Sequence, residues 1–258
     1  QVLFEGRDLR GMTEEQLRKL RGNEIAMIFQ DPLMTLNPVL KVGEQMREAI
    51  QTHHPKVTRQ QADKRCVEAL EMVGIPAAAK RLNAYPHEFS GGMRQRVAIA
   101  IAMLNNPKLI IADEPTTALD VTIQGQILYQ MQKLCRAHDT ALIWITHDLG
   151  VIAELADRVA VMYAGRIVET GTVDEVLSSP RHPYTKGLLS SMPATAEPGA
   201  RLAQIDGMAP SLAGREIGCA FRPRCPNAVA RCGESPPEIT VEGDRNYRCY
   251  VPIVQESL

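Results

Sequence analysis

Two acidic residues end an apolar segment near the middle of the sequence. The residues from Leu109 to Ala112 are all apolar, and Asp113 and Glu114 follow them directly. Such a run predicts a buried strand, and open α/β sheets bind ligands at the carboxyl ends of their strands. An aspartate there can hold Mg²⁺, and a neighbouring glutamate can act as general base on an attacking water. The pair alone also fits an ordinary polar turn after a strand.

Two more polar side chains follow expected strands. His147 comes after the segment 141–146, and Gln30 comes after the apolar run 25–29. A histidine at the end of a sheet strand can donate a hydrogen bond to a terminal phosphate. A neutral amide in such a place can bind metal-bound water. Because single residues of these types are usually structural, neither decides the function alone.

A serine and two glycines precede an expected helix over residues 90–105. The segment reads Ser90-Gly91-Gly92-Met93, and Ser90 is a good N-cap. Glycines let the backbone approach a ligand closely, and the free amides at a helix start attract anions. The plainer interpretation is a capped helix with a flexible entry.

Four cysteines crowd the end of the chain: Cys219, Cys225, Cys232 and Cys249. In a reducing compartment such a cluster indicates metal rather than disulfides. Four thiolates can hold a [4Fe-4S] cluster or zinc. The paired C-x2-C knuckles of zinc ribbons do not occur, and nearby arginines (Arg222, Arg224, Arg231 and Arg248) would offset the negative charge of a cluster. We therefore favour iron-sulfur, with zinc or metal-free thiols as alternatives. Cys66 and Cys135 are expected to be ordinary buried thiols.

Composition excludes some classes of function. The 258 residues carry 29 basic and 30 acidic side chains, a net charge of -1, which does not indicate a nucleic-acid partner. No apolar run approaches the roughly 18–20 residues that span a bilayer, and no signal peptide opens the sequence. We expect a cytoplasmic protein that reaches any membrane through a partner.

Strands and helices alternate along the first two thirds of the chain, which predicts an α/β fold with a mainly parallel sheet. Strands are expected at 2–4, 24–29, 109–112 and 141–146, with a hairpin at 158–163 and 166–170. Helices are expected to start near Thr13 and to cover 42–53, 58–73, 90–105, 123–137 and 149–156. The segment 36–105 is therefore a helical insertion. Proline and glycine become frequent after a boundary near Ser178 to Pro183.

The order of these motifs resembles the ATP-binding cassette family. The corresponding family motifs are the Q-loop, signature, Walker B, D-loop and H-loop. They match Gln30, Ser90-Gly91-Gly92-Met93, Asp113-Glu114, Ala118-Leu119-Asp120 and His147. The resemblance implies a P-loop NTPase-like cassette that binds ATP and Mg²⁺ and dimerises head to tail. It implies that Glu114 is the general base, His147 the γ-phosphate switch and Asp120 a contact across the dimer. Gln30 and Asp113 would be associated with Mg²⁺, and the signature would contact ATP bound to the other subunit.

The phosphate-binding motif of this family, G-x-x-x-x-G-K-[ST], does not occur in the sequence. In the family it precedes the strand that ends at the Q-loop, so we expect it upstream of Gln1 in a longer parent ATPase. A subunit that offers only its signature side to a partner's ATP is the alternative. Without the lysine and the amide nest, this chain alone is expected to bind ATP weakly and to hydrolyse it negligibly.

Three stretches narrow the resemblance to importers of dipeptides, oligopeptides and nickel. They are Phe29-Gln30-Asp31-Pro32 with Leu36-Asn37-Pro38, the segment 89–96, and His182-Pro183-Tyr184-Thr185. The last resembles the start of the C-terminal extension of peptide-importer ATPases, and the nearest likeness is to the dipeptide importer's ATP-binding subunit. We therefore divide the chain into a cassette, 1–178, and this extension, 179–258.

The resemblance also implies partners. These are a second cassette, more often non-identical, two membrane permease subunits and, indirectly, a periplasmic or extracellular solute-binding protein. The helical segment and the region after Gln30 would dock on the membrane subunits at the cytoplasmic face. Alternative functions are a nickel or other solute importer, a non-transport cassette acting on DNA or ribosomes, and an inactive, metal-binding interaction subunit. The two cassettes or long coiled-coil insertion usual in the DNA and ribosome class are not seen.

Overall fold

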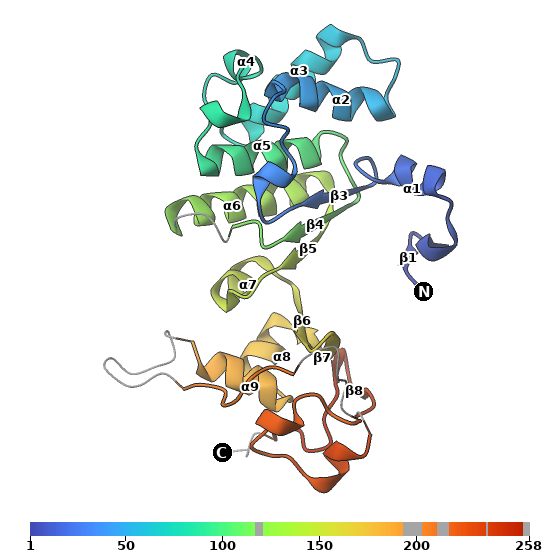
Figure 1. Ribbon diagram of the computed structural model, residues 1–258, viewed down its shortest axis with the longest axis vertical. Coiled ribbons are helices and arrows are strands. Elements are labelled where there is room, and N and C mark those ends of the chain that lie inside the picture. The colour runs from blue at the N-terminus through green and yellow to red at the C-terminus, as the bar shows by residue number, and fades with distance from the viewer. Residues whose placement is uncertain (117–120, 193–202, 211–216, 236, 255–258) are drawn as a thin grey trace. The chain divides into compact units, whose positions relative to one another are not determined.

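The computed structural model describes residues 1–116, 121–192, 203–210, 217–235 and 237–254. The chain forms two compact units, Gln1–His147 and Asp148–Leu258, and Figure 1 shows their elements. Each unit is described by itself. In the described residues, no helix has both the length and the apolar character needed to cross a membrane.

A three-stranded parallel sheet forms the centre of the first unit. Its strands are β3 (Ile25–Ile28), β4 (Leu109–Asp113) and β5 (Ala141–Ile145), in the order β3-β4-β5. Ile28 and Ala112 are register partners and are both fully buried. Helices α5 (Gly91–Met103) and α6 (Val121–His138) contribute to the same hydrophobic core. The predicted parallel α/β core is confirmed.

The helical insertion folds from strong local signals. Its main helices are α2 (Val42–His53), α3 (Arg59–Met72) and α5, with the short α4 (Ala78–Arg81) between them. Thr58 caps α3 in a reciprocal capping box with Gln61, and Thr13 caps α1 (Glu14–Leu20) in the same way with Gln16. Apolar faces of α2, α3 and α5 join the core of the sheet. Because capping residues and apolar faces can be recognised in the sequence, the helix boundaries at 42–53 and near 58–73 could be predicted. A small hairpin, β1 (Leu3–Phe4) with β2 (Arg7–Asp8), opens the unit.

The second unit contains a four-stranded antiparallel sheet in the order β6-β7-β9-β8. The predicted hairpin is confirmed as β6 (Arg158–Tyr163) with β7 (Arg166–Thr172), and α7 (Leu149–Leu155) precedes it. The C-terminal extension, residues 179–258 and called the tail below, adds β8 (Thr240–Glu242) and β9 (Arg245–Tyr247), which were not predicted from the sequence. The same unit contains helices α8 (Val173–Ser178) and α9 (Pro183–Ser190). Helix α8 was not predicted, and the Thr172–Glu175 capping box was the signal in the sequence that could have indicated it.

A separate hydrophobic core holds the tail to this sheet. Phe221 is buried and packs against the rings of Tyr163 and Tyr184, with ring centroids 5.2 and 5.4 Å away. His182 caps α9 by accepting the Tyr184 N–H at 3.0 Å, and burial lowers the pKa of His182 to about 4. Aromatic packing of this kind contributes beyond simple area burial, and it ties residues far apart in sequence into one body.

Candidate active site

The parallel sheet brings three of the predicted side chains together. Gln30, Glu114 and His147 each follow the carboxyl end of a strand, β3, β4 and β5 respectively. Gln30 Nε2 donates a hydrogen bond to Glu114 Oε2 at 2.9 Å, and His147 Nδ1 lies 3.0 Å from Glu114 Oε1. Both carboxylate oxygens therefore have a defined polar neighbour. An acid, an amide and an imidazole meet at the edge where such sheets bind ligands.

The backbone of Glu114 is unusual. Its φ is 43°, in the left-handed region that residues other than glycine, asparagine and aspartate seldom adopt. Its N–H donates to the Ile145 carbonyl of β5 at 2.9 Å, which holds the residue just past the end of β4. Conformations of this kind cost on the order of 1–3 kcal/mol and gather at functional sites. The strain and the two side-chain neighbours single out Glu114 within this edge.

The exposure of these groups suits a reaction with water. The Glu114 side chain is 27% exposed and that of His147 is 70% exposed. A partly shielded carboxylate can take a proton from water, while an exposed imidazole can reach a ligand. Asp113, half-buried at the end of β4, adds a second carboxylate. Mg²⁺ prefers oxygen ligands and usually binds one or two carboxylates together with substrate phosphates, so these residue types fit it.

The signature residues form a separate group at the start of α5. Ser90 is the N-cap and its Oγ accepts the Met93 N–H at 3.3 Å. Gly91 is exposed, and a side chain built on it would meet no atom within 4 Å. The helix start is thus accessible, and its free amides can approach an anion. Asp120, with Ala118 and Leu119, lies outside the described residues.

The four tail cysteines lie in one region but do not form a recognisable metal site. The Cys219 N–H donates to the Cys232 carbonyl at 2.9 Å. Burial, together with the charges of the other three thiols, raises the pKa of Cys249 to about 11, so the four thiols are neighbours. Across the described ranges, no group of three or more His, Cys, Asp or Glu is placed to hold a metal ion. Cys66 and Cys135 are buried, and burial raises the pKa of each thiol to about 11.

Two of the tail arginines have other partners than we expected. Arg224 donates to the carbonyls of Ile205 and Asp206 at 2.9 and 2.8 Å, and Arg248 donates to the carbonyl of Pro237 at 3.2 Å. These contacts tie the loops of the tail together. Because backbone carbonyls are neutral, both guanidinium groups keep their positive charge, and charge compensation by these arginines stays a prediction.

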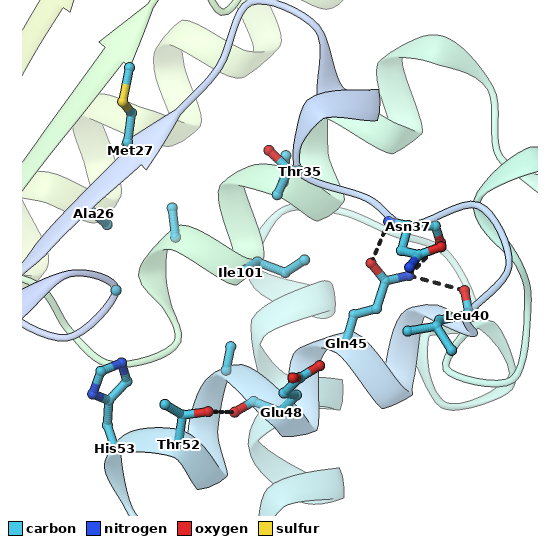
Figure 2. Close-up of a pocket in the computed structure, with 14 residues that line it drawn as sticks. Ala26, Met27, Thr35, Asn37, Leu40, Gln45, Glu48, Thr52, His53 and Ile101 are labelled. Carbon is cyan, nitrogen blue, oxygen red and sulfur yellow. Dashed lines mark hydrogen bonds between the residues drawn. The ribbon is translucent and has the colours of Figure 1, made fainter. Parts of the chain in front are cut away.

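The first unit contains a groove of about 420 Å³, which Figure 2 shows and which was not predicted from the sequence. Its walls come from α2, α5, β3 and the segment 35–40. The side chain of Gln45 fixes this segment: its Oε1 accepts the Asn37 N–H at 2.8 Å, and its Nε2 donates to the Asn37 and Leu40 carbonyls, each at 3.0 Å (Figure 2). The amphipathic pattern of 42–53 was the only signal in the sequence for this face.

Comparisons with known proteins agree with this architecture. Residues 1–117 match the family described as "ABC transporter", and residues 168–232 match "Oligopeptide/dipeptide transporter, C-terminal region". The chain is 55% identical to the oligopeptide transport ATP-binding protein OppD of Bacillus subtilis, over 96% of this chain and 69% of OppD. It is 49% identical to the dipeptide transport ATP-binding protein DppD of the same organism, over 94% of this chain and 72% of DppD.

A solved structure has the same fold. The dimeric ATP-binding cassette MJ0796 bound to ADP and Pi superimposes with a TM-score of 0.60 and 27% identity. The match covers 66% of this chain and 72% of that one. The likeness therefore extends over most of a nucleotide-bound cassette.

Proposed function

Because the chain belongs to the ATP-binding cassette transporter family, we propose specific roles for its residues and partners. Its function is that of the ATP-hydrolysing subunit that energises import of oligopeptides or dipeptides. The observation that carries the assignment of the site is the Glu114 carboxylate between Gln30 and His147 at the carboxyl edge of the parallel sheet. The relatives' names support peptides rather than nickel as the solute.

In this proposal Glu114 is the general base that takes a proton from the attacking water. Gln30 orients the carboxylate through its amide hydrogen bond. His147, which is more exposed, contacts the γ-phosphate of ATP, and Asp113 and Gln30 supply oxygen atoms for Mg²⁺. The metal supplies charge neutralisation of the phosphates when it is bound.

We propose that the signature surface completes a site on a second cassette. The accessible amides at the start of α5, with Ser90, Gly91, Gly92 and Met93, would contact ATP held by the partner. Asp120 would contact the partner across the dimer. We favour a non-identical partner cassette. The solved MJ0796 cassette is described as a dimer, which supports dimerisation in general.

The remaining partners follow from the transport function. We propose two membrane permease subunits, with a solute-binding protein acting on them from outside. The groove of the first unit, beside the segment after Gln30, would receive a permease segment. This would place the subunit peripherally on the cytoplasmic face of the membrane.

A test of the catalytic role uses Glu114→Gln in the complete transporter. The variant keeps the size and most hydrogen bonds of the side chain but cannot take the proton, so kcat for ATP hydrolysis should fall by about 10²–10⁴-fold. Glu71→Gln, an exposed carboxylate on α3, is the matched control and should leave kcat unchanged. Phosphate release measures both. A Glu114→Gln enzyme with the wild-type kcat would remove Glu114 from the role of base.

We also propose that the tail thiols Cys219, Cys225, Cys232 and Cys249 hold a [4Fe-4S] cluster, with zinc as the alternative. Their mutual proximity supports it, although side chains would have to rotate to ligate one ion. Protein purified without oxygen should be brown, contain iron and sulfide, and lose its visible absorption in a Cys232→Ser variant. Colourless protein with stoichiometric zinc would contradict the cluster and support zinc.

A further inference from the structure

One residue, Arg94, holds two consecutive peptide units at the start of α5. Its Nη1 donates to the Phe89 carbonyl at 2.9 Å, and its backbone N–H donates to the Ser90 carbonyl, also at 2.9 Å. A peptide unit is planar and trans, so its C=O and N–H bonds point in opposite directions. Holding these two carbonyls therefore also sets the directions of the Ser90 and Gly91 N–H groups.

These N–H groups are available to a ligand. In the described part of the chain, the N–H groups of Ser90, Gly91 and Gly92 are bonded to no acceptor, whereas the Met93 N–H donates to Ser90 Oγ. Ser90 and Gly91 are also exposed. Because glycine restricts the backbone less than other residues do, the direction of these donors depends on what holds the chain around them.

The residue before Ser90 is fixed from a second side. Phe89 has only 3% of its surface exposed, and the guanidinium carbon of Arg81 on α4 lies 5.3 Å from the centroid of its ring. A cation over an aromatic face at this distance is attracted to it. Burial and Arg81 thus hold the Phe89 side chain, while the Arg94 guanidinium holds the Phe89 carbonyl.

The charge of Arg94 is unusual for its position. Helix starts favour acidic side chains, yet the first turn of α5 contains none and Arg94 follows it directly. Its Nε is shielded from solvent and has no hydrogen-bond partner among the residues that the structure describes. An unpaired donor and a cation near a helix start both reduce stability, which offsets the gain from the bond to Phe89. We therefore expect Arg94 to contribute little to the fold, while the positive potential of the helix start remains available to an anion.

We propose that Arg94 is a positioning residue for ATP hydrolysis. By holding the Phe89 carbonyl, it orients the Ser90 and Gly91 N–H groups toward the phosphates of ATP bound to the partner cassette. This inference rests on the proposed function, in which the start of α5 contacts that ATP. Donors fixed in advance need no reorganisation when charge develops on the phosphate, so their orientation affects the rate.

The test is Arg94→Met in the complete transporter, measured by phosphate release and thermal unfolding. Methionine keeps an unbranched apolar stem but cannot donate to Phe89, so kcat should fall by about tenfold or more. KM for ATP should change by less than about threefold, because the other cassette captures ATP first and the loss falls on the later chemical step. The melting temperature should stay within about 3 °C of the wild-type value.

Two further variants complete the test. Arg94→Lys can still donate to the Phe89 carbonyl, so it should recover most of the lost kcat. Arg59→Met is the matched control, because Arg59 is an exposed arginine at the first position of α3. It should leave kcat, KM and the melting temperature unchanged.

Each outcome decides the proposal. A wild-type kcat in Arg94→Met, or an equal loss of kcat in Arg94→Lys, would overturn it. A KM that rises as much as kcat falls would contradict it, since Arg94 would then serve the capture of ATP. A larger fall in melting temperature, or an Arg94→Met chain that does not fold, would assign Arg94 to the fold and reject the positioning role. Failure of the proposed function itself would instead appear as Glu114→Gln retaining full ATP hydrolysis.

Discussion

At the scale of single residues, the strained backbone of Glu114 is the structural feature that supports its proposed role as the base. A φ of 43° places its side chain beyond the last residue of β4. There its carboxylate oxygens lie 2.9 Å from Gln30 Nε2 and 3.0 Å from His147 Nδ1. The cost of roughly 1–3 kcal/mol is offset by the parallel sheet, which fixes the Glu114 N–H on the Ile145 carbonyl. The strained backbone thereby positions the Glu114 carboxylate at the carboxyl edge of the parallel sheet.

Another residue-scale feature is the buried ion pair of the second unit. Arg245 Nη2 donates to Glu169 Oε1 at 2.7 Å, and their side chains are 5% and 0% exposed. Glu169 also accepts the N–H groups of Arg181 and His182, at 2.7 and 2.9 Å. The pair joins β9 of the tail to β7 and to the chain just before α9.

Arg245→Met should destabilise this unit by about 3–5 kcal/mol, because it leaves the Glu169 carboxylate buried without its cation. Urea unfolding followed by near-ultraviolet circular dichroism of the tyrosines measures the change. The double variant Arg245→Met/Glu169→Gln removes both charges and should recover a large part of the loss. A loss below about 1 kcal/mol in the single variant would show that the pair contributes little.

At the scale of elements, local signals and the parallel sheet account for what could be predicted. Capping residues such as Thr58 locate helix starts, and parallel strands bring Gln30, Glu114 and His147 to one edge whatever their distance in sequence. The left-handed backbone of Glu114 and its pairing with both neighbours could not be predicted, because they depend on side-chain packing at that edge.

The pairing of β9 with β7 also escaped prediction. Arg245 and Glu169 are 76 positions apart, and the strands of the tail are only three residues long. Short strands with no clear alternation carry little signal, and such non-local pairing is set by tertiary contacts. The groove could not be predicted for a similar reason, because its walls come from four separate segments of the chain. Met34, Val39 and Leu40 are exposed apolar side chains in or beside this groove, and their exposure is known only from the structure.

At the scale of the whole molecule, the two compact units correspond to the two family matches. The match described as "ABC transporter" falls in the first unit and the peptide-transporter C-terminal match falls in the second. The predicted division at residue 178 stays a prediction, and the compact units themselves meet at His147 and Asp148. The first unit holds Glu114, which we propose as the base, and the proposed signature surface at the start of α5, and the second holds the four tail cysteines.

The most direct test of the central claim is uptake of a labelled oligopeptide by the complete transporter in liposomes. With ATP supplied on the side of this subunit, the wild-type transporter should accumulate peptide, and without ATP it should not. The Glu114→Gln transporter should bind ATP but accumulate no peptide, while Glu71→Gln should match the wild type. Peptide accumulation by Glu114→Gln at the wild-type rate, or accumulation by the wild type without ATP, would contradict the account.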